Sequence, residues 1–329
     1  MLINFNDLEV TLNCVNFFLF FFDLSSILRC EKPRIFASKD CIISFGVNLA
    51  VFSVLRIPFI LFEIFFGFFV KLSVDVVRIN LFDNFSNLIH ASSPRYFKNT
   101  SDEIEQYDFV GRDSSEKKTE HLIRFMETVK IKNKPPFLIN QIHSDEIFIL
   151  KDESQTREQV SKIKADAIIT HLSEIPIGIF TADCIPVLLY DPKLHVAAAI
   201  HAGREGTLQG IVNKSISAMK QEYGCKPQDL VAGLGLGIGG CCYEIDENCL
   251  SSFENKIPFE PPFVKSKENG KFLLDLFAVN AQQGIDAGLL PENILRSEEC
   301  TFCSPMNYFS YRREGKTGRI LTFIMLQPR

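Results

Sequence analysis

Short apolar runs of the β type follow one another closely in the middle of the chain, and they constrain its fold most. Asp191-Pro192-Lys193 separates the last two runs and is typical of a tight turn, so we expect a β-hairpin there. Helical spacing of apolar residues precedes these runs over 116–130 and follows them over 208–223, and Gly224 is a typical helix stop. We therefore predict one α/β domain over residues 86–329. The runs are 137–141, 147–150, 167–170, 177–181, 185–190 and 195–200.

The composition of the 329-residue chain is that of a folded protein, with 23% charged and 46% hydrophobic residues. The 35 basic and 40 acidic side chains give a net charge of −5, which argues against a nucleic-acid-coating protein and against a nucleic-acid partner. The 10 cysteines are scattered over a long chain, whereas small disulfide scaffolds are short and dense in cysteine. We therefore expect reduced thiols and a cytoplasmic location.

Residues 1–85 form a hydrophobic extension that differs in texture from the rest, and more than half of the 31 phenylalanines lie in it. The stretch Val47–Val70 is about long enough to cross a bilayer, but Arg56, Pro58 and Glu63 interrupt it. Three interpretations stay open: a weak membrane anchor, a buried or poorly ordered extension, and an upstream extension that is not part of the working protein. The last is favoured, so we expect no membrane partner.

Two histidines and one cysteine stand at the ends of strand runs. His143 ends the run that begins at Phe137, Cys184 lies between two runs, and His201 closes the run that begins at His195. Side chains at strand ends can converge on one pocket, and two imidazoles with one thiolate suit zinc. Three protein ligands would leave a fourth position for water or substrate. Spacings of 41 and 17 residues do not establish a site, and core or turn residues are the alternative.

The other histidines show no chemical partners in the sequence. His195 shares a strand face with His201, but about 20 Å of strand separates them, so we interpret it as structural. We interpret His90, His121 and His171 as surface or turn residues.

Two further motifs are incomplete. The segment 235–240 satisfies G-x-G-x-x-G, but Cys241-Cys242-Tyr243 is a poor helix start, so a glycine nest that contacts a substrate is favoured over a dinucleotide site. Cys300-x-x-Cys303 has the spacing of half a zinc knuckle, and no second C-x-x-C completes it.

Seven sequence motifs follow one another along the chain in this order: Asn140-Gln-Ile-His143, Thr181-Ala-Asp-Cys-Ile-Pro186, His201-Ala-Gly203 with Gly206-Thr207, Gly239-Gly-Cys-Cys-Tyr-Glu244, Asp275-Leu276, Cys300-Thr301 and Tyr308-Phe-Ser-Tyr-Arg-Arg313 with Thr317-Gly-Arg319. They resemble the laccase-domain proteins, long labelled multicopper polyphenol oxidases and now described as purine nucleoside phosphorylases with adenosine deaminase activity. Several bacterial members are also called peptidoglycan editing factors. The resemblance spans about residues 88–326.

The resemblance implies an α/β/β/α layered domain with mixed sheets, and zinc rather than copper held by His143, Cys184 and His201. It also implies phosphorolysis of adenosine, inosine, guanosine and methylthioadenosine to the base and ribose 1-phosphate, together with deamination of adenosine. Purine nucleosides and inorganic phosphate are then the expected partners. We interpret Asp183 as a candidate for proton transfer, and Arg204 or Arg312 as the holder of an anion.

One departure from the family bears on phosphate binding. The family pattern His-Ala-Gly-Trp-Arg-Gly-Thr reads His201-Ala-Gly-Arg204-Glu205-Gly-Thr207 here, so an acid occupies the usual arginine position. We expect Glu205 either to weaken phosphate binding or to pair with Arg204. Two alternatives stay open: a metal-free cysteine hydrolase of the peptidoglycan-editing type, with Cys184 as nucleophile and His201 as base, and a catalytically impaired binding protein.

Overall fold

The computed structural model describes residues 75–99, 101, 103–110, 115–256, 263–267 and 270–329. These residues belong to the unit Phe62–Arg329. Residues 1–74 of the expected extension, with the apolar stretch Val47–Val70, lie outside the described residues. In the part of the chain that is described, no helix combines the length and the hydropathy that a bilayer crossing requires.

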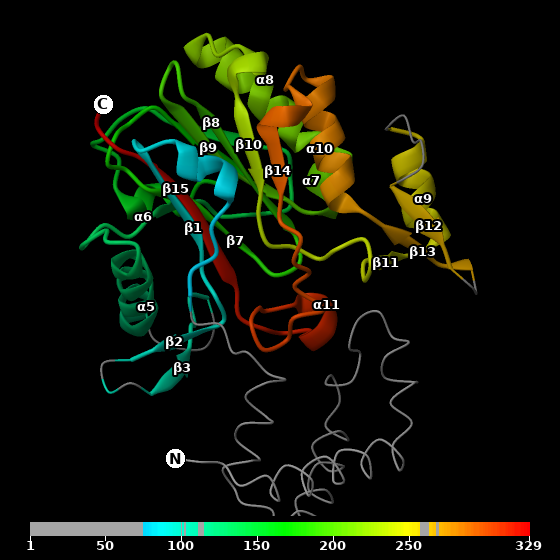
Figure 1. Cartoon of the computed structure of the whole chain (residues 1–329), viewed down its shortest axis with the longest axis horizontal. Coiled ribbons are helices and arrows are strands. Elements are labelled where there is room, and N and C mark those ends of the chain that lie inside the picture. The colour runs from blue at the N-terminus through cyan, green and yellow to red at the C-terminus, as the bar shows by residue number, and fades with distance from the viewer. Residues whose placement is uncertain (1–74, 100, 102, 111–114, 257–262, 268–269) are drawn as a thin grey trace, which may run out of the picture. The chain divides into compact units, whose positions relative to one another are not determined.

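Two mixed sheets form the centre of the described unit (Figure 1). The larger has the order β14-β10-β8-β9-β6-β5 and comprises β5 (Ile147–Leu150), β6 (Ala167–Thr170), β8 (Ile185–Asp191), β9 (Val196–Ala202), β10 (Val231–Leu234) and β14 (Ile294–Arg296). The other has the order β1-β15-β7-β4 and comprises β1 (Leu88–Ser92), β4 (Phe137–Leu138), β7 (Ile177–Thr181) and β15 (Ile320–Leu326). Smaller sheets are formed by β11 (Glu244–Ile245), β13 (Phe272–Leu274) and β12 (Val264–Ser266), and by β2 (Tyr96–Lys98) and β3 (Ile104–Gln106).

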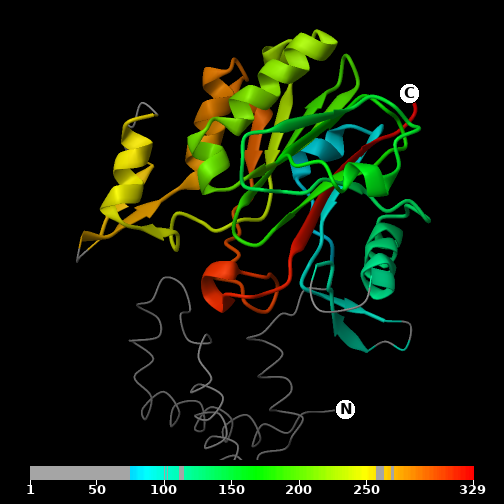
Figure 2. The ribbon, with the colours of Figure 1, turned by 180° about the vertical axis from the view of Figure 1, so that it is seen from behind.

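Helices cover the outer faces of these sheets (Figures 1 and 2). The α-helices are α5 (Ser115–Thr128), α6 (Arg157–Val160), α7 (Arg204–Leu208), α8 (Ile211–Tyr223), α9 (Glu247–Glu254), α10 (Leu276–Asp286) and α11 (Tyr311–Glu314). Short 3₁₀ helices are η1 (Asn80–Asn84), η2 (Pro227–Asp229) and η4 (Pro291–Asn293).

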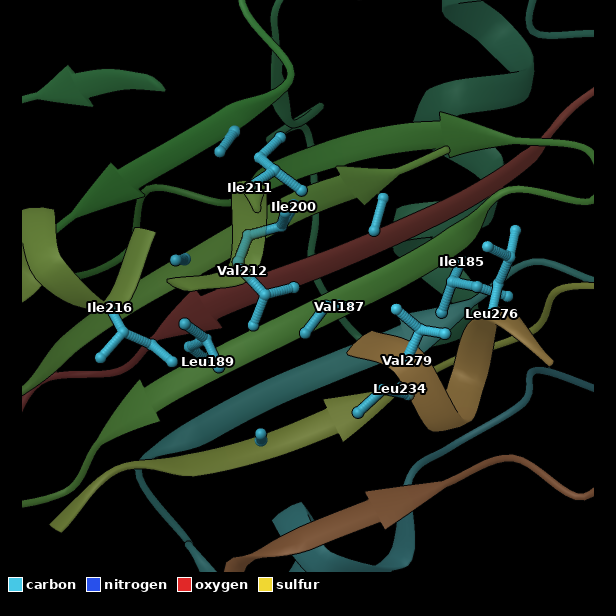
Figure 3. Packing of buried hydrophobic residues seen from close by; sticks show 14 of the residues in the cluster. Ile185, Val187, Leu189, Ile200, Ile211, Val212, Ile216, Leu234, Leu276 and Val279 are labelled. Carbon is cyan, nitrogen blue, oxygen red and sulfur yellow. The ribbon is translucent and has the colours of Figure 1, made fainter. Parts of the chain in front are cut away.

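Strands β8 and β9 are buried along their whole length because layers cover them on both faces. Val187 and Leu189 of β8 point toward α8 and α10, where they meet Ile216 and Val279 (Figure 3). The intervening Leu188 packs in a second cluster with residues of β7 and β15, so it faces the other sheet. This alternation is the two-residue period of a strand, with apolar residues on both faces.

The four-stranded sheet is covered on its far side by α5. Phe125 and Met126 of α5 pack with Leu321, Phe323 and Met325 of β15. The layers therefore follow the order helix, sheet, sheet, helix, and the predicted α/β/β/α fold with mixed sheets is confirmed.

The predicted hairpin is formed by β8 and β9, with Ile185 opposite Ala202 and Asp191 opposite Val196. The helix predicted over 208–223 is divided into α7 and α8, with Gly210 between them. Gly224 ends α8 in the left-handed region at φ 74°, as predicted.

The residues just before β1 pack against the six-stranded sheet. Phe82 of η1 is 0% exposed, and a Cβ on Gly233 of β10 would lie 2.6 Å from its ring. The sequence pattern assigns residues 75–85 to the extension, yet their side chains contribute to the core between the sheets. The surface interpretation of two histidines is wrong: His90 accepts a hydrogen bond from Ile79 N–H and is 1% exposed, and His121 is 3% exposed.

Candidate metal centre

Three side chains from separate segments meet at one end of the β8–β9 hairpin. One imidazole nitrogen of His143, one of His201 and the Sγ atom of Cys184 all lie within 4.8 Å of one another. The hairpin register accounts for two of them, because Pro186 lies opposite His201 and Cys184 immediately precedes the paired strand. The rings of His143 and His201 meet edge to face, with 4.8 Å between their centroids.

The loop that carries His143 is attached to the end of β7. The side-chain amide of Gln141 donates to the carbonyl of Phe180 and accepts from its N–H group, both at 2.8 Å. His143 itself has a positive φ of 59°. The loop thus continues the pairing of β4 with β7 through a side chain, which brings the imidazole toward Cys184.

Gly203 packs directly against the side chains of the centre. A Cβ at this position would lie 3.1 Å from Cys184 Sγ and 3.3 Å from His143 Cδ2. Any other residue would therefore press against two of the three side chains. Two imidazoles and one thiolate in a cradle of this size form a donor set that fits zinc and leaves a coordination position open.

Charges within the centre favour the ligand form of the cysteine. Burial alone would raise the pKa of Cys184, but the neighbouring His201 and His143 outweigh it and lower this pKa to about 6. Burial would likewise lower the pKa of His201, and the Cys184 thiolate and Asp166 raise it to about 9. The thiolate, rather than the thiol, binds metals and acts as a nucleophile.

Asp166 is the residue that the sequence patterns did not reveal. It is 0% exposed, and its carboxylate accepts hydrogen bonds from the backbone N–H groups of Ile142, His143 and Ser144, and from the Ser144 hydroxyl. His201 Nδ1 lies 2.7 Å from Asp166 Oδ1, which leaves Nε2 as the atom that faces the centre.

One carboxylate therefore orients one histidine through its ring and the other through its backbone. Burial would raise the pKa of Asp166, but the hydrogen bonds from His201 and Ser144 lower it to about 2. The sequence signal for this role was slight: a single acid directly before the apolar run 167–170.

Asp183 lies beside Cys184 and is held by two donors. It has a φ of 89°, is 8% exposed, and accepts hydrogen bonds of 2.6 Å from the Thr301 hydroxyl and from the backbone N–H of Arg312. The carboxylate thus connects the Cys184 turn to the loop after β14 and to the first residues of α11.

The two arginines predicted to hold an anion differ in their partners. Arg204 pairs with Glu205 through Nε and Nη2 at 2.9 and 2.8 Å, so Glu205 pairs with its neighbour as one of the two expectations states. Arg312 donates from Nη1 to the carbonyl of Glu244 and lies 4.9 Å from the centre of the Tyr243 ring.

Tyr243 links these arginines to the centre. Burial and the nearby Cys249 raise the pKa of its phenol to about 12, while the charges of Arg204 and Arg312 oppose this and the charge of Cys184 reinforces it. The geometry places Arg312 beside the centre, because its guanidinium lies over the Tyr243 ring and its backbone N–H donates to Asp183, the residue before Cys184.

The glycine-rich segment 235–240 packs against the turn that carries Asp183 and Cys184. A Cβ on Gly237 would overlap with Ile185 Cδ1 and would lie 3.1 Å from the Asp183 carbonyl oxygen. The N–H group of Ile238 donates to that carbonyl at 2.8 Å. These glycines therefore permit close backbone packing within the protein, a reason different from the expected contact with a substrate.

Comparisons with known proteins agree with this architecture. The family model for the multi-copper polyphenol oxidoreductase laccase matches residues 100–327. A purine nucleoside phosphorylase of Clostridium acetobutylicum is 36% identical over 189 residues, which is 57% of this chain and 75% of that protein. A purine nucleoside phosphorylase of Bacteroides thetaiotaomicron is 36% identical over 180 residues, or 54% of this chain and 66% of that protein.

The fold also resembles that of a solved structure. The hypothetical protein YfiH of Bacillus licheniformis superposes with a TM-score of 0.70 at 24% identity, over 78% of this chain and 97% of that one. At this identity the likeness concerns the fold.

Proposed function

The chain belongs to the multi-copper polyphenol oxidoreductase laccase family, and we propose that it is a zinc-dependent purine nucleoside phosphorylase that also deaminates adenosine. The observation that carries the proposal is the convergence of His143, Cys184 and His201 within 4.8 Å, oriented by the buried Asp166. The names of the relatives from Clostridium acetobutylicum and Bacteroides thetaiotaomicron support the reaction class.

The proposed substrates are adenosine, inosine, guanosine and methylthioadenosine with inorganic phosphate, and the products are the free base and the sugar 1-phosphate. The residues that would hold zinc are His143, Cys184 and His201. When bound, zinc supplies a Lewis acid for a substrate oxygen at the open coordination position. Copper is less suited, because a multicopper oxidase needs several copper centres and the chain has 6 histidines in all.

We assign phosphate binding to Arg312 in preference to Arg204. Arg204 already pairs with the Glu205 carboxylate, whereas Arg312 contacts a carbonyl oxygen and an aromatic ring. Among the described residues no carboxylate forms an ion pair with Arg312. An unneutralised guanidinium beside the centre is suited to a doubly charged oxyanion, to which it can offer two parallel N–H groups.

Asp183, the candidate for proton transfer, is better suited to hold Arg312. Its two oxygens accept the Thr301 hydroxyl and the Arg312 backbone N–H, so both are occupied in the resting protein. We therefore propose that Asp183 is a positioning residue that fixes the start of α11 against the Cys184 turn.

A second candidate uses Cys184 and His201 of the centre together with Asp166, without His143. Cys184, His201 and Asp166 have the order of contacts of a nucleophile, a base and an orienting carboxylate. A cysteine hydrolase built in this way would need no metal, so removal of zinc separates the two candidates.

The test is product analysis with the full chain. Adenosine should yield adenine only when phosphate is present, and inosine whether phosphate is present or not. Cys184→Ser should lose both activities and the zinc of this centre, whereas Cys249→Ser, which changes a half-buried cysteine of α9 that is not a ligand of this centre, serves as the matched control for the zinc content. Phosphorolysis that survives complete removal of zinc by a chelator would contradict the proposal, as would the absence of turnover with every nucleoside.

A further inference from the structure

Four cysteines from two distant segments lie together outside the centre described above. Cys241 and Cys242 follow the glycine-rich segment, and Cys300 and Cys303 lie in the loop after β14. All four Sγ atoms lie within 4.8 Å of one another, and Cys303 Sγ is 3.3 Å from Cys242 Sγ and 3.8 Å from Cys241 Sγ. None of the four forms a disulfide. We call this group the four-cysteine cluster.

The backbone around the cluster is held by hydrogen bonds between the two segments. Gly237 and Cys300 form a parallel β-bridge, and the N–H group of Thr301 donates to the Gly237 carbonyl at 3.0 Å. The N–H group of Gly239 donates to Cys300 Sγ at 3.1 Å. Backbone N–H groups that donate to a sulfur orient thiolate ligands and stabilise their charge in metal sites.

We propose that the four-cysteine cluster holds a structural zinc ion. Zinc bound by four thiolates is tetrahedral with Zn–S bonds of about 2.3 Å, which places neighbouring sulfurs about 3.8 Å apart. The sulfur separations in the cluster, from 3.3 Å to at most 4.8 Å, surround this value. Four protein ligands leave no coordination position for a substrate, so the role of the ion is structural: it joins the two chain segments.

The cluster supplies what the sequence motif lacked. Cys300-x-x-Cys303 provides two ligands, and the adjacent pair Cys241-Cys242 provides the other two in place of a second C-x-x-C. Zinc would then close the segment between the two pairs, and its binding energy would stabilise the folded chain.

A zinc ion at the four-cysteine cluster would also stabilise the separate centre at Cys184, through the loop that carries Cys300 and Cys303. Thr301 lies between the two ligands of the loop, and its hydroxyl donates to Asp183. Arg313 donates to the carbonyls of Thr301 and Phe302, which anchors the same loop to α11. A zinc ion at the cluster would therefore fix the loop that positions the neighbour of Cys184.

The test is the zinc content of the full chain and its variants, measured by mass spectrometry of the metal with the protein concentration from amino-acid analysis. The wild type should contain two zinc ions per chain, and Cys184→Ser, which leaves the four-cysteine cluster intact, should retain one. Cys303→Ser should also retain one, Cys184→Ser with Cys303→Ser should retain none, and the control Cys249→Ser should retain two.

A spectroscopic measurement identifies the ligands of the retained ion. Co²⁺ exchanged into Cys184→Ser should give strong thiolate-to-cobalt charge transfer and the intense visible bands of a tetrahedral site, and both should disappear in the double variant. A Cys184→Ser protein that folds but contains no zinc would overturn the proposal even if Cys303→Ser cannot be purified. A Cys242–Cys303 disulfide in the freshly purified wild type would also overturn it. None of these results depends on nucleoside turnover, so failure of the proposed enzyme activity would be seen separately.

Discussion

Replacement of Asp166 by asparagine tests whether one buried carboxylate assembles the metal centre. The change keeps the shape of the side chain but replaces one acceptor oxygen by an NH₂ group. With the amide oxygen placed toward Ile142 and Ser144, the NH₂ group would face the N–H of His143 and Nδ1 of His201. The His143 N–H then loses its acceptor, and His201 loses a charged partner.

The magnitude follows from these two losses. A buried donor without a partner costs about 1–3 kcal/mol, and a hydrogen bond to a charged group contributes about 1.5–3 kcal/mol. We therefore expect Asp166→Asn to lower the free energy of unfolding by roughly 2.5–6 kcal/mol. Because the partners of metal-binding histidines typically contribute about 10- to 100-fold to metal affinity, the zinc affinity of the centre should fall within that range.

The assay combines urea unfolding with a zinc competition titration against a chromophoric chelator. Asp152→Asn is the matched control, since Asp152 is exposed and accepts a local hydrogen bond from Ser154 N–H. The control should change the free energy of unfolding by less than about 0.5 kcal/mol. An Asp166→Asn protein that is as stable as the control and binds zinc equally well would refute the reasoning.

Three further predictions concern other parts of the molecule. Glu205→Gln should remove the carboxylate that neutralises Arg204, so that Arg204 adds its charge to that of Arg312, and should lower the KM for phosphate about 1.4- to 5-fold without changing the zinc content, because an exposed pair of this kind is worth about 0.2–1 kcal/mol; identical phosphate curves would show that the pair does not oppose anion binding. A chain that begins at residue 75 should unfold cooperatively. A chain that begins at residue 86 lacks Phe82 and Ile79 of the core, so it should melt at a lower temperature or aggregate, and calorimetry of the two proteins distinguishes these outcomes. Burial lowers the pKa of His90 to about 4 from an ordinary value near 6.5. Between these two pH values the imidazole is protonated in the unfolded chain and neutral in the folded chain. The stability that His90 contributes is therefore complete above pH 6.5 and is lost as the pH falls toward 4, by about 3 kcal/mol. His90→Gln should weaken this pH dependence, and urea midpoints that fall equally between pH 7 and pH 4.5 in both proteins would contradict it.

The parts of the fold that the sequence predicted are those that local signals determine. The turn at Asp191-Pro192-Lys193 and the apolar runs beside it predict the β8–β9 hairpin, and once the hairpin forms its register brings Cys184 beside His201. The glycine that ends α8 is likewise a local signal. The layering of the helices came from the resemblance to a family, because the period of a strand that is buried on both faces does not tell which layer covers it.

The features that the sequence did not predict depend on partners far along the chain. His90 and His121 are buried because Ile79 and Asp108 supply N–H groups to their ring nitrogens, and neither histidine carries a sign of this in its own neighbourhood. Asp166 receives donors from the segment 142–144 and from His201, which become neighbours only after β6 pairs with β9. The four-cysteine cluster joins residues about 60 positions apart, so a search for regularly spaced ligand pairs finds only half of it.

Asp183 shows how these distant contacts determine the geometry of the centre. A non-glycine residue at φ 89° is strained, and such a conformation persists only where surrounding contacts stabilise it. The contacts are the Thr301 hydroxyl and the Arg312 N–H, which come from the loop of the four-cysteine cluster and from α11. Because Cys184 directly follows Asp183, the position of its thiolate depends on segments more than 100 residues away. The strained turn therefore connects the two cysteine-containing groups, and a change that releases the loop at 300–303 should shift the Cys184 thiolate while the centre still holds its zinc ion.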